Sequence, residues 1–121
     1  MKKKILIVDD EHYLIDIQEQ IIKREGYESI TAENGKQAVE IAAAQLPDLI
    51  LLDFSLPDMD GLEVARLIHA NPKSQSTPII IVTGGTSLEQ KDKCLEAGFS
   101  DYINKPFTPE QIRSSIRKLL K

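Results

Sequence analysis

Short runs of consecutive apolar residues alternate with longer amphipathic stretches along the whole chain, and this alternation restricts the possible folds more than any other feature. The apolar runs are Ile5–Val8, a weaker one at Ser29–Ala32, Leu49–Leu52, Ile79–Val82 and the short Tyr102–Ile103. Runs that are apolar at every position are typical of strands buried on both faces, as in a parallel sheet. The sequence therefore predicts a sheet of five strands covered on both sides.

The stretches between these runs have the apolar spacing of helices. In the first, Tyr13, Ile17 and Ile21 recur every four residues and Leu14 extends their stripe, which indicates the apolar face of a helix. Residue pairs that resemble capping boxes precede the other stretches, at Asn34 and Gln37, Asp60 and Glu63, Ser87 and Gln90, and Thr108 and Gln111. The predicted helices span Glu11–Glu25, Gly35–Gln45, Gly61–Ala70, Leu88–Ala97 and Pro109–Leu120.

A strand followed by a helix, five times over, predicts a doubly wound (βα)5 fold of the α/β class. Right-handed crossovers place the helices on both faces of the parallel sheet. With 121 residues, of which 41% are hydrophobic and 28% charged, the chain is expected to form a single domain over residues 1–121. Such sheets place their functional sites at the carboxyl ends of the strands, where the strand order reverses.

Charge and composition exclude several classes of function. A net charge of -4 argues against contact with nucleic acid by this domain, because phosphate backbones require a basic surface. The longest apolar runs have four residues, which is far too short to span a membrane, and acids end the first run too early for an export signal. The single cysteine, Cys94, cannot form an internal disulfide. We therefore expect a reducing, cytoplasmic environment.

Polar side chains follow four of the predicted strands. Asp9 and Asp10 follow the first, Asp53 the third and Thr83 the fourth, and Lys105 comes shortly after the fifth. Adjacent strands are about 5 Å apart, so the three carboxylates would raise one another's pKa unless a cation joined them. Carboxylate oxygens with room for water suit Mg²⁺. Lys105 adds a second positive charge, so the predicted pocket suits a doubly charged phosphoryl group.

A carboxylate can itself be the nucleophile that accepts a phosphoryl group, giving an aspartyl phosphate. Asp53 is the favoured acceptor, because acids lie on one side of it and Thr83 and Lys105 on the other. Each residue also has a purely structural interpretation when taken alone. Asp10 could cap the first helix, Lys105 could be a solvated surface residue and Tyr102 an ordinary half-buried aromatic. The placement of all of them at one edge of the sheet carries the functional interpretation.

Six motifs, in this order and at these intervals, resemble the receiver domain of bacterial two-component response regulators, including the single-domain chemotaxis type. They are Ile5–Glu11, Asp48–Asp53, Leu56–Gly61, Ile79–Thr83, Ala97–Tyr102 and Lys105–Phe107, and the match covers essentially the whole chain. The resemblance implies the flavodoxin-like strand order 2-1-3-4-5. It also implies a phosphoacceptor switch, not an enzyme, since such domains catalyse only their own phosphorylation and dephosphorylation.

The resemblance to receiver domains also implies a role for each acid. Asp53 would accept the phosphoryl group from a phosphohistidine on a partner histidine kinase or phosphotransfer protein. Asp10 and Asp53 would bind Mg²⁺ directly, the backbone carbonyl of Ser55 would be a third ligand, and Asp9 would act mostly through water.

It further implies how the domain would signal. Thr83 and Lys105 would hold the phosphoryl oxygens, and Tyr102 would change rotamer together with Thr83. The bond between Lys105 and Pro106 is expected to be cis. The face made by the helix at Leu88–Ala97, the last strand and the last helix would then change its affinity for a downstream protein target or an output domain. The oligomeric state stays open, with dimerisation on phosphorylation as one outcome.

Three other functions are consistent with parts of the pattern. A Mg²⁺-dependent phosphohydrolase shares the Asp nucleophile, but Ser55 stands where such an enzyme has a second acid, and the chain has no room for a cap domain. A flavin or nucleotide binder needs glycines and hydroxyls in the first strand–helix turn, which is acidic here. A receiver that only binds partners, without phosphorylation, would not need the polar set Asp9, Asp10, Asp53, Thr83 and Lys105. Whether the chain is stand-alone or part of a larger regulator stays open.

Overall fold

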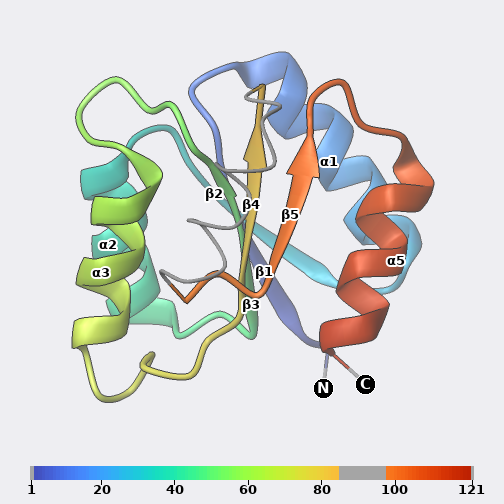
Figure 1. Ribbon diagram of the computed structural model, residues 1–121. Helices are drawn as coiled ribbons and strands as arrows, with labels where there is room; N and C mark the ends of the chain where they lie inside the picture. The colour runs from blue at the N-terminus through green and yellow to red at the C-terminus, as the bar shows by residue number, and fades with distance from the viewer. Residues whose placement is uncertain (1, 85–97, 121) are drawn as a thin grey trace.

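A computed structural model describes residues 2–84 and 98–120, which form a parallel sheet of five strands with helices on both faces (Figure 1). The strands are β1 (Lys4–Val8), β2 (Glu28–Ala32), β3 (Leu49–Asp53), β4 (Ile79–Thr83) and β5 (Asp101–Asn104). The helices are α1 (His12–Arg24), α2 (Gly35–Gln45), α3 (Gly61–Ala70) and α5 (Pro109–Leu119). The sheet order β2-β1-β3-β4-β5 confirms the predicted fold. The predicted helix at Leu88–Ala97 and its cap at Ser87 lie outside the described residues.

Two apolar clusters, one on each side of the sheet, form the core. Helices α2 and α3 cover one face, and α1 and α5 cover the other (Figure 1). Alternate residues of a strand point to opposite faces, so Leu6 and Ile50 belong to the first cluster whereas Ile5 and Leu49 belong to the second. All four of these side chains are fully buried. Burial on both faces explains why the strands are apolar at every position.

The buried face of α1 differs from the predicted stripe. Tyr13 and Ile17 are 62% and 42% exposed, whereas Ile15, Ile21 and Ile22 are buried. A spacing of four residues advances by about 40° per step around a helix with 3.6 residues per turn, so such a stripe winds away from the core. Ile15 and Ile22, seven residues apart, stay on one side. The interpretation of Tyr13 and Ile17 as core residues was therefore wrong.

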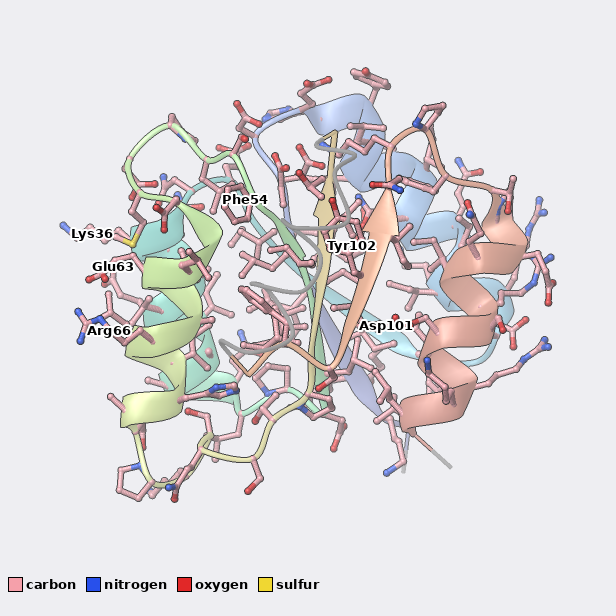
Figure 2. All side chains as sticks on the ribbon, in the orientation of Figure 1. Lys36, Phe54, Glu63, Arg66, Asp101 and Tyr102 are labelled. Atoms are coloured by element: carbon pink, nitrogen blue, oxygen red, sulfur yellow. The ribbon has the colours of Figure 1, made fainter. Side chains whose placement is uncertain are left out.

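Three of the predicted helix caps are observed. The side chains of Asn34, Asp60 and Thr108 each accept a hydrogen bond from the backbone N–H three residues later. At α3 the capping box is incomplete, because Glu63 pairs with Arg66 on the outer side of the helix (Figure 2). Among the described residues, no helix combines the length and the apolar character needed to cross a lipid bilayer.

Candidate functional site

The backbone register of the sheet brings the predicted site residues to one edge. In the ladder between β1 and β3, Asp9 follows β1 at the level at which Asp53 ends β3. Thr83 ends β4, and its backbone carbonyl accepts a hydrogen bond from the Lys105 N–H at 2.8 Å. The carboxyl ends of four neighbouring strands therefore supply the candidate site, as the sequence predicts.

The three acids lie close together. One carboxylate oxygen from each of Asp9, Asp10 and Asp53 lies within 4.8 Å of the others. Asp9 and Asp53 are 1% and 6% exposed, whereas Asp10 is open to solvent. Asp10 does not cap α1, because the N-cap residue is Glu11 and no side chain caps this helix. The interpretation of Asp10 as the cap of this helix is therefore wrong.

Lys105 bridges the two buried acids. Its Nζ lies 3.4 Å from Asp9 Oδ2 and 3.3 Å from Asp53 Oδ1. Burial raises the pKa of both Asp9 and Asp53, and the attraction of Lys105 offsets this only in part. Burial also lowers the pKa of Lys105, but Asp53 and Asp9 outweigh it and raise this pKa above its ordinary value. One ammonium group among three carboxylates leaves an excess of negative charge.

This donor set fits a hard divalent cation. Within residues 2–84 and 98–120, Asp9, Asp10 and Asp53 are the only group of three or more His, Cys, Asp or Glu side chains close enough to share an ion. All the ligand atoms are carboxylate oxygens, and exposure of Asp10 leaves space for water. Mg²⁺ prefers oxygen ligands, takes few of them from the protein and keeps several waters. The residues present therefore suit Mg²⁺.

The structure also places the remaining predicted site residues. Ser55 lies in the β3–α3 loop (residues 54–60), and its N–H donates to Asp53 Oδ1 at 3.3 Å. Thr83 is buried, and half-buried Tyr102 on β5 packs against the core cluster that α2 and α3 cover (Figure 2). The cis peptide bond between Lys105 and Pro106 is confirmed.

The sequence did not predict a hydrogen-bond network around Asp101, which joins β5 to α5. Asp101 Oδ2 accepts hydrogen bonds from Ser115 Oγ at 2.5 Å and from Lys118 Nζ at 3.2 Å, which ties β5 to α5 (Figure 2). Asp101 Oδ1 accepts from the Tyr102 N–H at 2.8 Å. Burial raises the pKa of Asp101, but these bonds outweigh it and hold the pKa below its ordinary value. The available signal was Ser115, a polar residue next to Ile116 on the apolar side of the last helix.

Solved structures of signal receiver domains have the same fold. The Vibrio cholerae chemotaxis protein CheY4 gives a TM-score of 0.93 at 29% identity, covering 99% of this chain and 100% of that one. The receiver domain of sensor histidine kinase PA1611 from Pseudomonas aeruginosa gives a TM-score of 0.89 at 31% identity, covering 98% of each chain. In that structure a magnesium ion is coordinated in the active site cleft. The fold is thus that of a signalling receiver domain.

The chain belongs to the response regulator receiver domain family, which its sequence matches over residues 5–117. It is 36% identical over 121 residues to the alkaline phosphatase synthesis transcriptional regulatory protein PhoP of Bacillus subtilis. It is 38% identical over 119 residues to the phosphate regulon transcriptional regulatory protein PhoB of Pseudomonas aeruginosa. These matches cover 100% and 98% of this chain but only 50% and 52% of the relatives, so the chain spans about half their length. The predicted family is confirmed.

Proposed function

We propose that residues 1–121 form a single receiver domain that works as a phosphoacceptor switch, with Asp53 as the acceptor. The phosphoryl group would come from a phosphohistidine on a histidine kinase or phosphotransfer protein. One observation carries this proposal: the Asp53 carboxylate lies within 4.8 Å of the other two acids and 3.3 Å from Lys105 Nζ. Asp9 is also buried beside Lys105, but it follows β1, whereas Asp53 ends β3, the strand between β1 and the β4 strand that ends at Thr83.

In the transfer, a carboxylate oxygen of Asp53 forms a bond to phosphorus while the P–N bond to the imidazole breaks. The electron pair of that bond returns to the imidazole, which takes up a proton from solvent. Lys105 holds one phosphoryl oxygen through its ammonium group, and Thr83 donates its hydroxyl to another. Because phosphoryl transfer depends mainly on positioning and neutralisation, these few groups are sufficient. Phosphorylation then adds about one further negative charge and strong acceptor oxygens.

Four residues would hold the cation. Asp10 and Asp53 would each provide a carboxylate oxygen and Ser55 its backbone carbonyl, while Asp9 would act mostly through water. Exposure of Asp10 supports its part in this set, because its carboxylate is open to solvent and the Lys105 contacts involve the other two acids. When bound, Mg²⁺ supplies positive charge that neutralises the phosphoryl oxygens.

The signalling face would consist of Leu88–Ala97, β5 and α5, of which Leu88–Ala97 lies outside the described residues. Support comes from the sheet, in which Thr83 and Tyr102 stand on neighbouring strands. New charge-assisted bonds from Thr83 and Lys105 are worth roughly 1.5–3 kcal/mol each. A shift from 1:99 to 99:1 between two states needs about 5.5 kcal/mol. Two such bonds would therefore change the affinity for a protein target or output domain only if the second state is already accessible.

Intact-mass spectrometry after incubation with acetyl phosphate and Mg²⁺ tests the acceptor. We expect the wild-type chain to gain one phosphoryl group, and Asp53→Asn to gain none. Asp48→Asn is the matched control, because Asp48 is an exposed acid at the other end of β3 and should not change the yield. An adduct that persists in Asp53→Asn would refute the assignment. Steady release of phosphate from a phosphomonoester without the adduct would instead indicate a phosphohydrolase.

A further inference from the structure

The β3–α3 loop closes on itself beside the acids. The Gly61 N–H donates to the Phe54 carbonyl at 2.9 Å, and Ser55 forms an isolated antiparallel bridge with Asp60. Because the hydrogen bond of this bridge joins the flanking residues, Ser55 directs its own N–H and C=O away from Asp60. The Ser55 N–H meets Asp53 Oδ1 at 3.3 Å. The side of Ser55 that bears its N–H and C=O therefore faces the acids.

Asp58 fastens this loop to the start of α2. Its Oδ1 accepts a hydrogen bond from the Gly35 N–H at 2.8 Å, and its Oδ2 accepts from the Lys36 N–H at 3.0 Å. These bonds hold the pKa of the exposed Asp58 below its ordinary value. Asn34 accepts the next N–H, that of Gln37. The first three N–H groups of α2 thus all have side-chain acceptors, and the loop supplies two of them.

Close packing reinforces the attachment. A Cβ atom on Gly35 would lie 2.8 Å from Met59 Sδ and 2.9 Å from a methyl carbon of Val64, so both side chains pack directly against Gly35. The first turn of α2 and the loop are therefore in direct contact, next to the place where α2 and α3 lie side by side (Figure 1). Ser55, Pro57 and Asp58 are exposed, so the Asp58 bonds are a main restraint on this part of the loop.

We propose that Asp58 is a positioning residue for the cation site: by fastening the β3–α3 loop to α2, it keeps the Ser55 carbonyl directed at the acids. This inference rests on the proposed function, in which that carbonyl is a cation ligand. Ligand groups must be held to about 0.5 Å for tight binding, and an exposed loop does not provide this alone. Residues that orient a ligand in this way typically change metal affinity by about 10–100-fold when they are replaced.

Isothermal titration calorimetry with Mg²⁺ on the unphosphorylated chain tests this role. Asp58→Asn keeps the side-chain shape but places an NH₂ group against a backbone N–H, and we expect the Kd for Mg²⁺ to rise about tenfold. Asn34→Ala is the matched control, since it removes a cap from the same helix without touching the loop. It should lower the melting temperature and leave the Kd unchanged. Asp58→Glu keeps the charge and both oxygens, and we expect an intermediate Kd.

The outcomes separate this inference from the proposed function. Equal Kd values for wild type, Asp58→Asn and Asp58→Glu would overturn the positioning role, and so would an equal loss of affinity in Asn34→Ala. Either result leaves the acceptor assignment intact if the wild-type chain still binds Mg²⁺ and takes up a phosphoryl group at Asp53. A wild-type chain that binds no Mg²⁺ would refute both. Circular dichroism confirms that each variant is folded, and Asp58→Glu decides the question if Asp58→Asn is not.

Discussion

The pKa values of two pairs of aspartates, Asp9 and Asp53 in the acid cluster and Asp58 and Asp101 outside it, shift in opposite directions. Asp58 and Asp101 each receive hydrogen bonds on both oxygens, and the pKa of each is lowered. Asp9 and Asp53 each accept one backbone N–H and share Lys105, and the pKa of each is raised. Residue type alone therefore does not determine the direction in which the pKa of an acid shifts; its burial and the donors around it do.

The difference has an energetic meaning. A buried carboxylate with too few donors destabilises the folded state, because burial removes water that the protein does not fully replace. Asp9 and Asp53 are in this condition, with one lysine between them. Under the proposed function, this loss of stability is the kind that proteins commonly tolerate at a functional site. A divalent cation bound to these acids would neutralise the excess negative charge.

The largest expected change in stability comes from replacing Asp101, an acid with a lowered pKa. Asp101→Asn should lower the free energy of unfolding by about 2 kcal/mol, because it removes the charge that strengthens the bonds from Ser115 and Lys118. Urea denaturation followed by circular dichroism measures this. Asp48→Asn, at an exposed position, keeps a side-chain oxygen that can accept the Lys4 N–H and should change stability by less than about 0.5 kcal/mol. A loss in Asp101→Asn no larger than in this control would show that the network contributes nothing.

Replacing Asp53, an acid with a raised pKa, should change the free energy of unfolding in the opposite direction. In buffer with EDTA, Asp53→Asn should raise the free energy of unfolding by about 1 kcal/mol, because it removes a buried charge and leaves Lys105 paired with Asp9. The same urea experiment measures the change, with Asp48→Asn again as the control. A decrease in stability would mean that the attraction between Asp53 and Lys105 outweighs the cost of burial.

The smallest effect concerns pH. The pKa of Asp101 in the folded state lies below 3.8, its ordinary value, so its charge stabilises the fold fully above pH 3.8. That contribution is lost as the pH falls through the lowered pKa. The difference in stability between wild type and Asp101→Asn should therefore narrow at pH values below 3.8, compared with neutral pH. Urea midpoints for both chains across this range provide the measurement, and a constant difference would contradict the assigned cause.

The sheet and the acid cluster were predictable because they depend on local patterns. Runs such as Leu49–Leu52 are apolar throughout, which requires burial on both faces, and the predicted strands agree with the observed ones to within two residues. Once the strands are parallel, their carboxyl ends meet at one edge. The proximity of Asp9, Asp10 and Asp53 then follows from the position of each after its strand.

The remaining features depend on contacts between distant segments. The attachment of Asp58 to Gly35 spans 23 residues and requires a particular loop conformation, which no spacing in the sequence encodes. Tyr13 and Ile17 fit a helical stripe, but burial depends on which side of α1 meets the sheet. The sequence places Lys105 at the site, but its contacts with both Asp9 and Asp53 depend on the reach of a flexible side chain.

The register of the sheet explains how far such chains diverge in sequence while keeping one architecture. Backbone pairing sets where each strand ends, and aliphatic residues of similar volume can replace one another in the two core clusters at small cost. Only 29% identity therefore accompanies a TM-score of 0.93 with CheY4. Insertions and deletions within a strand, in contrast to substitutions, would change this register. One residue added within β3 would move Asp53 off the edge and send every following side chain of the strand to the opposite face.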